Sequence, residues 1–356
     1  MLKTLIIFMK RVIIIGGGFA GARIANSLQG HFSVALIDTK NFFEFTPGIT
    51  RTLVQPSYRR FIEIHHRKYL KKASFRHDSV IGIDKQFVYT GKGEKILYDY
   101  TIIASGSRYN MPFKGENIFL ADRAKDLVDS HKRIHKSKRI LVVGGGLVGV
   151  EIAAEIVSKY KNKKVTLIQA DDRIIPRNSS KSADYCKKYL TDRGVKIILG
   201  QKVVAFKKNL VVTDKKTMIK ADMTLICTGI KPNSEFLKKH FSKNLDEKEH
   251  VIVNDKLQAC GLTNVFAVGD INNVMEEKTA QAAEKQSKIV IKNLKNLEKN
   301  KELLSYHPKK KAVVISLGKW DGILEWKNFV MTGKIPALLK WLIQIKTMLR
   351  YRIRAS

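Results

Sequence analysis

The stretch RVIIIGGGFAGARIANSLQGHFSVALID, which runs from Arg11 to Asp38, decides the fold of this chain of 356 residues. Its apolar run at 11–15 predicts a strand that is buried on both faces, as the strands of parallel sheets are. A glycine-rich turn, a helix over 22–29 and a second strand at 34–37 follow. This order of elements is one βαβ unit. The sequence therefore predicts an α/β fold built on a parallel sheet.

The turn between that strand and that helix carries the spacing GxGxxG at Gly16, Gly18 and Gly21. The first glycine makes the tight turn, the second lets backbone N–H groups reach a pyrophosphate, and the third lets the helix pack closely on the strand. Asp38 follows Gly16 by 22 residues, where a carboxylate accepts a hydrogen bond from a ribose 2′-OH. We predict a dinucleotide site with contacts from Gly16, Gly18, Phe19, Ala20, Gly21 and Asp38.

The same pattern returns 128 residues later, from Gly16 to Gly144. A strand at 139–143 leads into a second GxGxxG, a helix over 150–159 and a strand at 165–168 that ends at Gln169. This amide keeps a hydrogen bond to a ribose but, unlike a carboxylate, does not repel a 2′-phosphate. NADH is the default dinucleotide, and NADPH stays open because of this amide. The predicted contacts are Gly144, Gly146, Leu147, Val148, Gly149 and Gln169.

Composition sets further bounds on function. The chain has 66 Lys and Arg against 32 Asp and Glu, a net charge of +34, which calls for an acidic counterpart such as nucleic acid or anionic lipid. The three cysteines, Cys186, Cys227 and Cys260, form no CxxC pair, so a disulfide scaffold and a thiolate metal site are excluded. His131 and His135 lack a third ligand, so we expect no metal site.

Several segments together resemble the flavoprotein reductases that have two dinucleotide-binding domains. They are the two fingerprints, Ala104-Ser105-Gly106, the segment CTGIKPN at 227–233 and Val268-Gly269-Asp270, and the resemblance covers about residues 10 to 300. It implies that FAD binds at the first fingerprint and NAD(P)H at the second. The domains would then be an FAD domain over 1–117 and 247–305, interrupted by an NAD(P)H domain over 118–246.

The resemblance also implies further cofactor contacts. For FAD these are Thr46, Ala104, Ser105, Gly106, Gly269, Asp270 and Ala280, and for NAD(P)H they are Thr228 and Gly229. No sulfur atom occurs between Met9 and Met111, so thiol chemistry beside the flavin is excluded.

The remaining branch resembles the type II NADH:quinone oxidoreductases and the ferroptosis-suppressor quinone reductases. The segments Phe45-Thr46-Pro47 and TAQAAEKQ at 279–286 are similar to their aromatic-x-x-FTP and AQxAxQ motifs, and SLGKWDG at 316–322 is similar to a strand and turn. The second motif departs at Lys285, with Gln286 one place later. The implied activity is non-electrogenic electron transfer from NAD(P)H through FAD to a quinone.

Candidate catalytic residues are Glu151 and Gln281, and the candidate quinone residues are Gln281, Lys319 and Trp341. Glu151 comes two residues after Gly149, so it either approaches the nicotinamide and flavin or only stabilises the helix dipole. We expect Glu155, one turn later, to have only the structural role.

The C-terminal segment 306–356 is predicted to contact an anionic membrane from its cytoplasmic side. Residues 301–356 hold 12 Lys and Arg against 3 acids, a net of +9. On a helical wheel one face carries the apolar residues and the other the cations, as in interfacial anchors. The apolar face consists of Leu338, Trp341, Leu342, Ile345, Met348 and Leu349. The alternative is a helix packed on the core or across a homodimer.

Two other functions stay open at this stage. One is a soluble FAD-dependent NAD(P)H reductase of a small acidic electron-carrier protein, which would dock on the positive surface. The other is a nucleic-acid-binding flavoprotein like apoptosis-inducing factor. It ranks last because the lysines are dispersed and no array of stacking aromatic residues accompanies them.

Overall fold

The structure is a computed structural model that describes residues 9–108, 123–207 and 210–353. Its first unit contains a parallel sheet in the order β19-β9-β1-β2-β5. Helices α1 (Phe19–Leu28) and α9 (Ala280–Leu297) pack together on one face, and a small antiparallel sheet covers the other. The five strands are β1 (Arg11–Ile15), β2 (Ser33–Asp38), β5 (Ser74–His77), β9 (Tyr100–Ile103) and β19 (Val265–Ala267); the covering sheet is β6 (Val80–Ile83), β7 (Phe87–Thr90) and β8 (Lys95–Leu97).

The second unit repeats this plan with a parallel sheet in the order β13-β12-β11-β17. Helices α6 (Leu147–Lys159) and α7 (Ser180–Thr191) cover one face, α5 (Arg123–Lys136) precedes the sheet, and a small antiparallel sheet covers part of the other face. The strands are β11 (Arg139–Val143), β12 (Lys164–Ile168), β13 (Lys196–Ile198) and β17 (Met223–Ile226), then β14 (Val203–Lys207), β15 (Leu210–Thr213) and β16 (Met218–Lys220). The predicted α/β fold with two Rossmann-like units is confirmed.

Two short strands, β10 (Ser107–Arg108) and β18 (Lys231–Pro232), pair where the chain leaves the first unit and returns to it. After β18, Leu237 and Phe241 already lie in a core with Ile13 of β1. We therefore propose that the second unit ends at β18, earlier than the predicted boundary at 246. The predicted boundary at 117 lies outside the described residues.

Short elements complete the first unit. Between β2 and β5 the chain forms a small antiparallel pair of strands and several single-turn helices. The return segment after β18 adds further short helical turns. These elements are β3 (Phe42–Glu44), η1 (Thr46–Gly48), α2 (Ile49–Thr52), η2 (Pro56–Tyr58), α3 (Arg59–Ile62), β4 (Glu63–His65), α4 (His66–Tyr69), η3 (Glu235–Leu237), α8 (Lys238–Phe241), η4 (Ser242–Asn244) and η5 (Gly269–Ile271).

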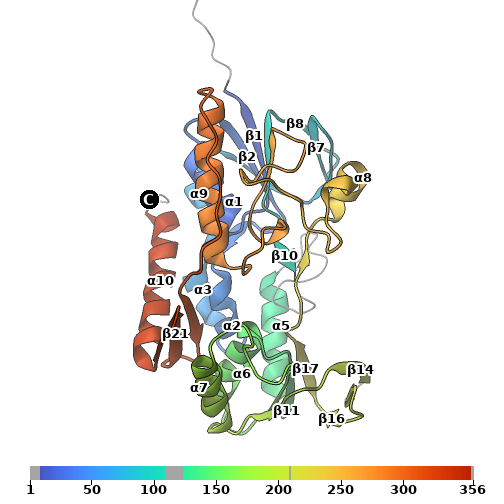
Figure 1. The fold of residues 1–356 in the computed structure, drawn as a ribbon, viewed down its shortest axis with the longest axis vertical. Helices are drawn as coiled ribbons and strands as arrows, with labels where there is room; N and C mark the ends of the chain where they lie inside the picture. Colours follow the sequence, from blue (N-terminus) through green and yellow to red (C-terminus); the bar gives the residue numbers. More distant parts are fainter. Residues whose placement is uncertain (1–8, 109–122, 208–209, 354–356) are drawn as a thin grey trace, which may run out of the picture.

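The C-terminal unit is an antiparallel sheet followed by one long helix. Strands β20 (Val313–Ser316), β21 (Gly322–Trp326) and β22 (Phe329–Thr332) lead into α10 (Lys334–Arg352), which packs on β20 and β21. Figure 1 shows α10 along one side of the molecule, next to β21. No helix of the described residues is long and apolar enough to cross a membrane.

The orientation of α10 is the opposite of that of a surface helix in a globular protein. Its polar side turns toward the protein, where Lys340 bonds Glu151 and Arg350 bonds Glu284. Its apolar side faces outward, with Trp341 half exposed. Lys340 and Arg350, which the sequence placed among the cations of an interfacial anchor, thus pair with acids of the body, whereas Lys334 and Lys346 are exposed. Of the predicted apolar face, Met348 is the member that is buried.

Candidate functional site

A cavity of about 1270 Å³ lies between the two units and the C-terminal unit. That volume exceeds the roughly 300–1,000 Å³ of sites for single drug-sized ligands, so an extended ligand fits. Its walls come from the first glycine loop, the start of α6, the N-terminal end of α9 and the segment before β20. All predicted FAD contacts except Gly21 line it: Gly16, Gly18, Phe19, Ala20, Asp38, Thr46, Ala104, Ser105, Gly106, Gly269, Asp270 and Ala280.

The first loop has the shape of a phosphate cradle. Gly16 has φ +98°, and a Cβ there would lie 2.4 Å from the carbonyl oxygen of Ala104. A Cβ on Gly21 would lie 1.8 Å from the carbonyl oxygen of Gly16, so the helix packs as the motif predicts. At Gly18, nothing lies within 4 Å of the Cβ position, which leaves the loop open at the start of α1. The helix N-terminus there favours an anion.

Asp38 supplies an ionised carboxylate at the cavity wall. Its Oδ2 accepts from the Gly17 N–H at 2.8 Å, and its Oδ1 accepts from the Lys40 N–H at 3.1 Å. Burial by itself would raise the pKa of Asp38, but the hydrogen bond from His66 and the charge of Lys40 hold it below its ordinary value. With the open loop and the size of the cavity, this acid fits FAD at the first fingerprint.

The second loop repeats the geometry. Gly144 has φ +103°, and a Cβ there would lie 2.8 Å from Thr228, a predicted NAD(P)H contact. A Cβ on Gly149 would lie 1.9 Å from the carbonyl oxygen of Gly144, and Gly146 is open. Gly229 also has positive φ, at +68°. Leu147 and Val148, after the loop, line the cavity.

Gln169 has a partner that sequence reasoning missed. Its Oε1 accepts from the Gly145 N–H at 2.7 Å, and its Nε2 donates to Asp171 Oδ2 at 2.5 Å. The carboxylate that is missing at position 169 is thus present two residues later. The signal was visible in the sequence, because Asp171 and Asp172 follow Gln169 after a single alanine.

Glu151 joins the second unit to the C-terminal unit. Its Oε1 accepts from the Ser316 N–H at 3.0 Å and from Lys340 Nζ at 2.5 Å. Both side chains of this ion pair are largely buried, and both residues line the cavity. Glu151 therefore reaches the cavity, and Lys340, interpreted from the sequence only as a cation of the C-terminal helix, is a site residue that sequence reasoning missed.

Glu155, one turn along α6, is tied to a different partner. Arg51 Nη2 donates to Glu155 Oε1 at 3.0 Å and to the Gly318 carbonyl oxygen at 3.0 Å. Burial raises the pKa of Glu155 against the opposing charge of Arg51. This pair connects α2, α6 and the turn after β20, which is the structural role expected for Glu155.

The three predicted quinone residues do not lie together. Gln281 lines the cavity, and its Nε2 donates to the Ala312 carbonyl oxygen at 3.1 Å. Lys319 lies in the turn after β20 with its Nζ 4.5 Å from the Trp320 ring centroid, and Trp341 faces outward from α10. Neither lines the cavity.

Gln286, whose place in the motif was uncertain, is buried behind the cavity. Its Oε1 accepts from the Gly269 N–H at 2.7 Å and from Asn272 Nδ2 at 2.8 Å. Its Nε2 donates to Glu276 at 2.9 Å. Gln286 thus holds the turn that carries Gly269 and Asp270.

Six lysines line the cavity, alongside acids such as Glu276, Glu277 and Glu325. They are Lys278, Lys309, Lys310, Lys311, Lys327 and Lys340. Lys311 pairs with Glu276 at 2.8 Å, and burial lowers the pKa of Lys278, whose Nζ donates to backbone carbonyl groups. The run of lysines at 309–311 was visible in the sequence but was interpreted only as part of a basic tail.

Thiol and metal chemistry find no support in the geometry. Burial raises the pKa of Cys186 and of Cys227 to about 12, so neither thiol ionises readily. No cysteine lines the cavity. Within residues 9–108, 123–207 and 210–353, no three His, Cys, Asp or Glu side chains are placed to hold a metal ion.

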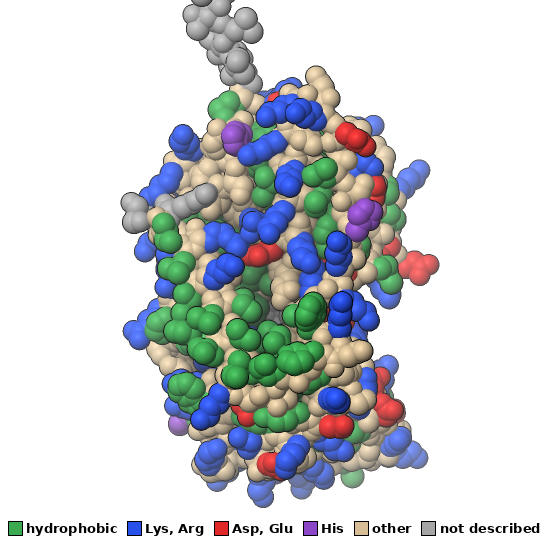
Figure 2. Space-filling model, turned by 60° about the vertical axis from the view of Figure 1, so that its left-hand side comes forward, with side chains coloured by type: hydrophobic (Ala, Val, Ile, Leu, Met, Phe, Trp, Pro, Cys, Tyr) green, Lys and Arg blue, Asp and Glu red, His purple; other side chains and the backbone are tan. Residues whose placement is uncertain are grey.

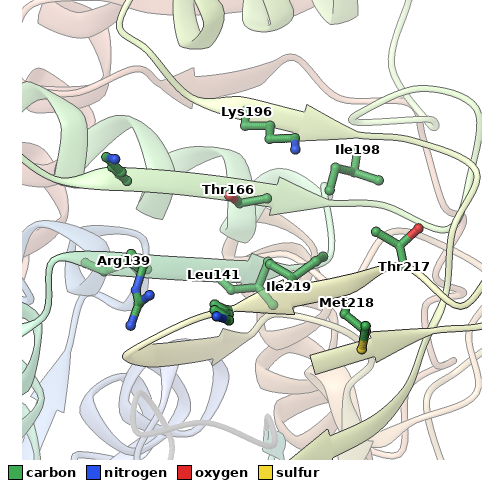
Figure 3. A pocket seen from close by; sticks show the side chains of 11 residues that line it. Arg139, Leu141, Thr166, Lys196, Ile198, Thr217, Met218 and Ile219 are labelled. Atoms are coloured by element: carbon green, nitrogen blue, oxygen red, sulfur yellow. The ribbon is translucent and has the colours of Figure 1, made fainter. Parts of the chain in front are cut away.

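A second hollow, of about 260 Å³, lies on the sheet of the second unit, against β16 (Figure 3). Its polar lining includes Arg139, Lys164 and Lys196, with Thr166 and Thr217. Arg139 is paired with Asp222 at 2.6 Å. None of the predicted site residues lines this hollow, so the candidate site is the large cavity.

The match to a family model agrees with this geometry. Residues 10–287 match the model of the pyridine nucleotide-disulphide oxidoreductases, and the chain belongs to that family. It binds FAD and NAD(P)H and is an NAD(P)H-dependent flavoprotein oxidoreductase.

The chain is similar in sequence to several relatives and shares its fold with solved structures. It is 34% identical over 335 residues to ferroptosis suppressor protein 1 of Xenopus tropicalis, with 88% of this chain and 87% of that protein covered. It is 32% identical to apoptosis-inducing factor homolog B of Dictyostelium discoideum, with 89% of each covered. The solved structure of NDH2 from Plasmodium falciparum in complex with NADH has the same fold, with a TM-score of 0.82, 14% identity, and 98% of this chain and 97% of that chain covered.

Proposed function

We propose that this protein is a non-electrogenic NADH:quinone oxidoreductase that takes its quinone from a membrane surface. One observation carries the proposal: the C-terminal unit closes one wall of the cofactor cavity and exposes an apolar face beside it. A quinone dissolved in lipid could then reach the cavity without crossing water. The similarity to ferroptosis suppressor protein 1 and the fold shared with NDH2 support the proposal.

The exposed apolar face is larger than scattered surface residues require. Figure 2 shows hydrophobic side chains gathered on this side of the molecule, with lysines and arginines around them. Contiguous exposed apolar patches on folded proteins mark partner or membrane contacts. The face consists of Ile335, Leu338, Trp341, Leu342, Ile343 and Leu349 of α10 with Trp320, Trp326 and Phe329 of the adjoining strands and turn.

Cations at the edge of this face suit anionic lipid headgroups. Lys319, Lys327, Lys334 and Lys346 are exposed. Each cation near an anionic leaflet contributes about 1 kcal/mol, while the inward Lys340 and Arg350 hold the helix on the protein. We propose this arrangement as a peripheral attachment in which the outward tryptophans enter the interface.

Within the cavity, the chain binds and orients. Bound FAD would supply the redox chemistry, the exchange of a hydride and of electrons between NADH and the quinone. The two glycine loops would hold the two pyrophosphates, and Glu151 would position the nicotinamide end while Lys340 keeps its charge neutralised. Gln281, which lines the cavity, would contact the quinone head.

We also propose a preference for NADH over NADPH. The Asp171 carboxylate is 2.5 Å from Gln169 Nε2, at the end of the strand where the adenosine ribose binds in this fold. A carboxylate there repels a 2′-phosphate.

The membrane proposal is tested by the triple variant L338S/W341S/L342S. We expect loss of sedimentation with anionic liposomes and loss of turnover of a liposomal long-chain quinone, with NADH:ferricyanide turnover retained. The control is M218S, which changes an apolar residue on the second unit that is even more exposed than these three. Full liposome binding by the triple variant, or its conversion from dimer to monomer in gel filtration without a membrane effect, would reject membrane contact in favour of a homodimer face.

A further inference from the structure

His66 lies directly behind the first glycine loop, where it has no solvent exposure and does not line the cavity. A Cβ on Gly17 would lie 2.4 Å from its Cε1 and 2.5 Å from its Nε2. The imidazole therefore packs against the loop backbone on the side where a side chain of residue 17 would point. The GxGxxG spacing does not require a glycine at position 17. The imidazole, together with the Asp38 carboxylate, leaves no room for a side chain there.

Two hydrogen bonds hold the ring in one orientation. His66 Nδ1 is 2.6 Å from the Tyr69 hydroxyl, and His66 Nε2 is 3.3 Å from Asp38 Oδ2. Burial raises the pKa of Tyr69 well above its ordinary value, so its hydroxyl keeps the proton and donates to Nδ1. Nε2 then carries the ring proton and donates to Asp38, and this tautomer satisfies both ring nitrogens.

The carboxylate of Asp38 is thereby held from two sides. Its Oδ2 accepts from His66 and also from the Gly17 N–H at 2.8 Å. Its Oδ1 accepts from the Lys40 N–H at 3.1 Å and from the Thr39 hydroxyl at 3.5 Å, and Asp38 lines the cavity. The orientation of the acid, and with it the path of the loop, depends on the imidazole.

The last turn of the C-terminal helix completes this cluster. Tyr351 is fully buried, with its ring centroid 4.8 Å from that of Tyr69 and 4.5 Å from that of Phe43. Aromatic pairs at such distances stabilise their arrangement beyond the apolar area that they bury. The ring of Tyr69, whose hydroxyl donates to His66, is thus held in part by α10.

We propose that His66 is a positioning residue for FAD, which orients Asp38 and the Gly17 backbone through hydrogen bonds, and that Tyr351 makes this orientation depend on the docked C-terminal helix. FAD binding and docking of α10 then favour each other, because each stabilises the same arrangement of Tyr69, His66 and Asp38. The inference concerns retention of the cofactor, and it stands whichever electron acceptor the enzyme uses.

The test measures the Kd of FAD by reconstitution of the full-length apoprotein, followed by flavin fluorescence. H66F keeps a ring but removes both hydrogen bonds, and we expect its Kd to rise about tenfold, the effect of one lost hydrogen bond to a charged group. H66Q returns a donor to Asp38 and should recover most of the affinity. Y69F should lie between H66F and the wild type, and H65A, in the exposed neighbouring residue, should match the wild type.

The coupling to α10 has its own matched pair. Y351A should raise the FAD Kd about threefold through loss of the ring contacts, whereas Y351F keeps the rings and should bind FAD normally. Melting of the apoproteins is measured in parallel. Wild-type FAD affinity in H66F and Y69F, even with lowered apoprotein melting temperatures, would show a purely structural cluster and overturn the proposal. If H66F does not fold, Y69F decides. Wild-type affinity in Y351A would overturn the coupling.

Discussion

The two glycine loops have nearly the same backbone and different side chains behind it. Gly16 and Gly144 have φ values of +98° and +103°, and the third glycines, Gly21 and Gly149, meet the loop carbonyl at almost equal distances. The middle N–H of each loop donates to the side chain that ends the next strand, at 2.8 Å to Asp38 and at 2.7 Å to Gln169. The backbone plan is thus independent of which dinucleotide it serves.

The two loops differ in the side chains that pack behind their backbones. A buried imidazole packs against the Cβ position of Gly17, whereas Ile174, Leu167 and the Cβ of Gln169 surround that of Gly145. The first loop is thus held by a buried imidazole and carboxylate, whereas the second is held by apolar contacts and by an amide that bonds the exposed Asp171 carboxylate. A rigid polar network suits a cofactor that stays bound, while the second dinucleotide must leave after every turnover.

The largest expected effect comes from adding one methyl group to each loop. A Cβ at Gly17 would lie 2.4 Å from the imidazole and 2.6 Å from the Asp38 carboxylate, so G17A must displace both. Overpacking costs about 1–3 kcal/mol, and we expect FAD affinity to fall about thirtyfold. The measurement is the Kd of FAD for the apoprotein.

G145A is the matched comparison. There the Cβ would meet Ile174 Cγ2 at 2.9 Å and Gln169 Cβ at 3.1 Å, which is less close than the 2.4 Å contact at Gly17. We expect normal FAD content and a severalfold higher KM for NADH. Equal FAD loss in both variants would mean that the two loops are not held differently.

The helices that begin at the loops differ as well, because α1 contains no acid and α6 contains Glu151 and Glu155. E151Q removes the partner of the buried Lys340 ammonium, which costs about 3 kcal/mol of unfolding free energy. We expect quinone turnover to fall about tenfold in addition, since the pair lines the cavity.

E155Q serves as the control for E151Q. It breaks the pair with Arg51 outside the cavity lining, so stability should fall while quinone turnover per folded enzyme stays normal. If E151Q and E155Q have the same turnover as each other, Glu151 has no role beyond the ion pair.

The sequence predicted the backbone plan well and the layer behind it poorly. Two strand–glycine–helix units, the acid at 38 and the amide at 169 follow from spacing, because turn geometry and helix packing restrict which residues fit. His66 could not be predicted, because it comes from a separate short helix that only the tertiary fold brings against Gly17. Its neighbour His65, with the same local sequence, is exposed.

The C-terminal helix was predicted in its pattern but not in its orientation. The wheel separates Trp341 from Lys340 and Arg350 correctly, yet a pattern alone does not say which side meets the protein. Glu151 and Glu284 decide this, since they offer buried partners to the cations from distant parts of the chain. Likewise, Lys319 is near Gln281 in motif order but lies outside the cavity.

A smaller effect is expected when the carboxylate that bonds Gln169, behind the second loop, is removed. D171N removes the carboxylate beside Gln169 and should lower the ratio of kcat/KM for NADH to that for NADPH about fivefold, mostly through a lower KM for NADPH. D172N, in the exposed residue that follows, is the control. An unchanged ratio in D171N would mean that the charge of Asp171 does not discriminate against the 2′-phosphate.

The smallest predicted effect is the pH dependence of stability from His66. Burial lowers its pKa despite the nearby Asp38, with Lys40 and His65 acting in the same direction as burial. Below the unfolded pKa of about 6.5, the unfolded chain takes up a proton that the folded imidazole does not, so stability falls as the pH falls through this window. The pKa of Asp38 is held below its ordinary value of 3.8, so its contribution is lost only at more acidic pH.

H66Q replaces the imidazole with a side chain that does not titrate. Between pH 7.5 and 5.5, we expect wild-type apoprotein to lose about 1 kcal/mol of unfolding free energy more than H66Q, measured by denaturant unfolding at each pH. H65Q should behave like the wild type, because the His65 side chain is exposed and does not pack behind the first loop. A parallel fall in wild type and H66Q would mean that the folded protein takes up the proton on His66. The first loop would then be backed by a cation and an anion, and the contrast with the neutral amide of the second loop would be larger still.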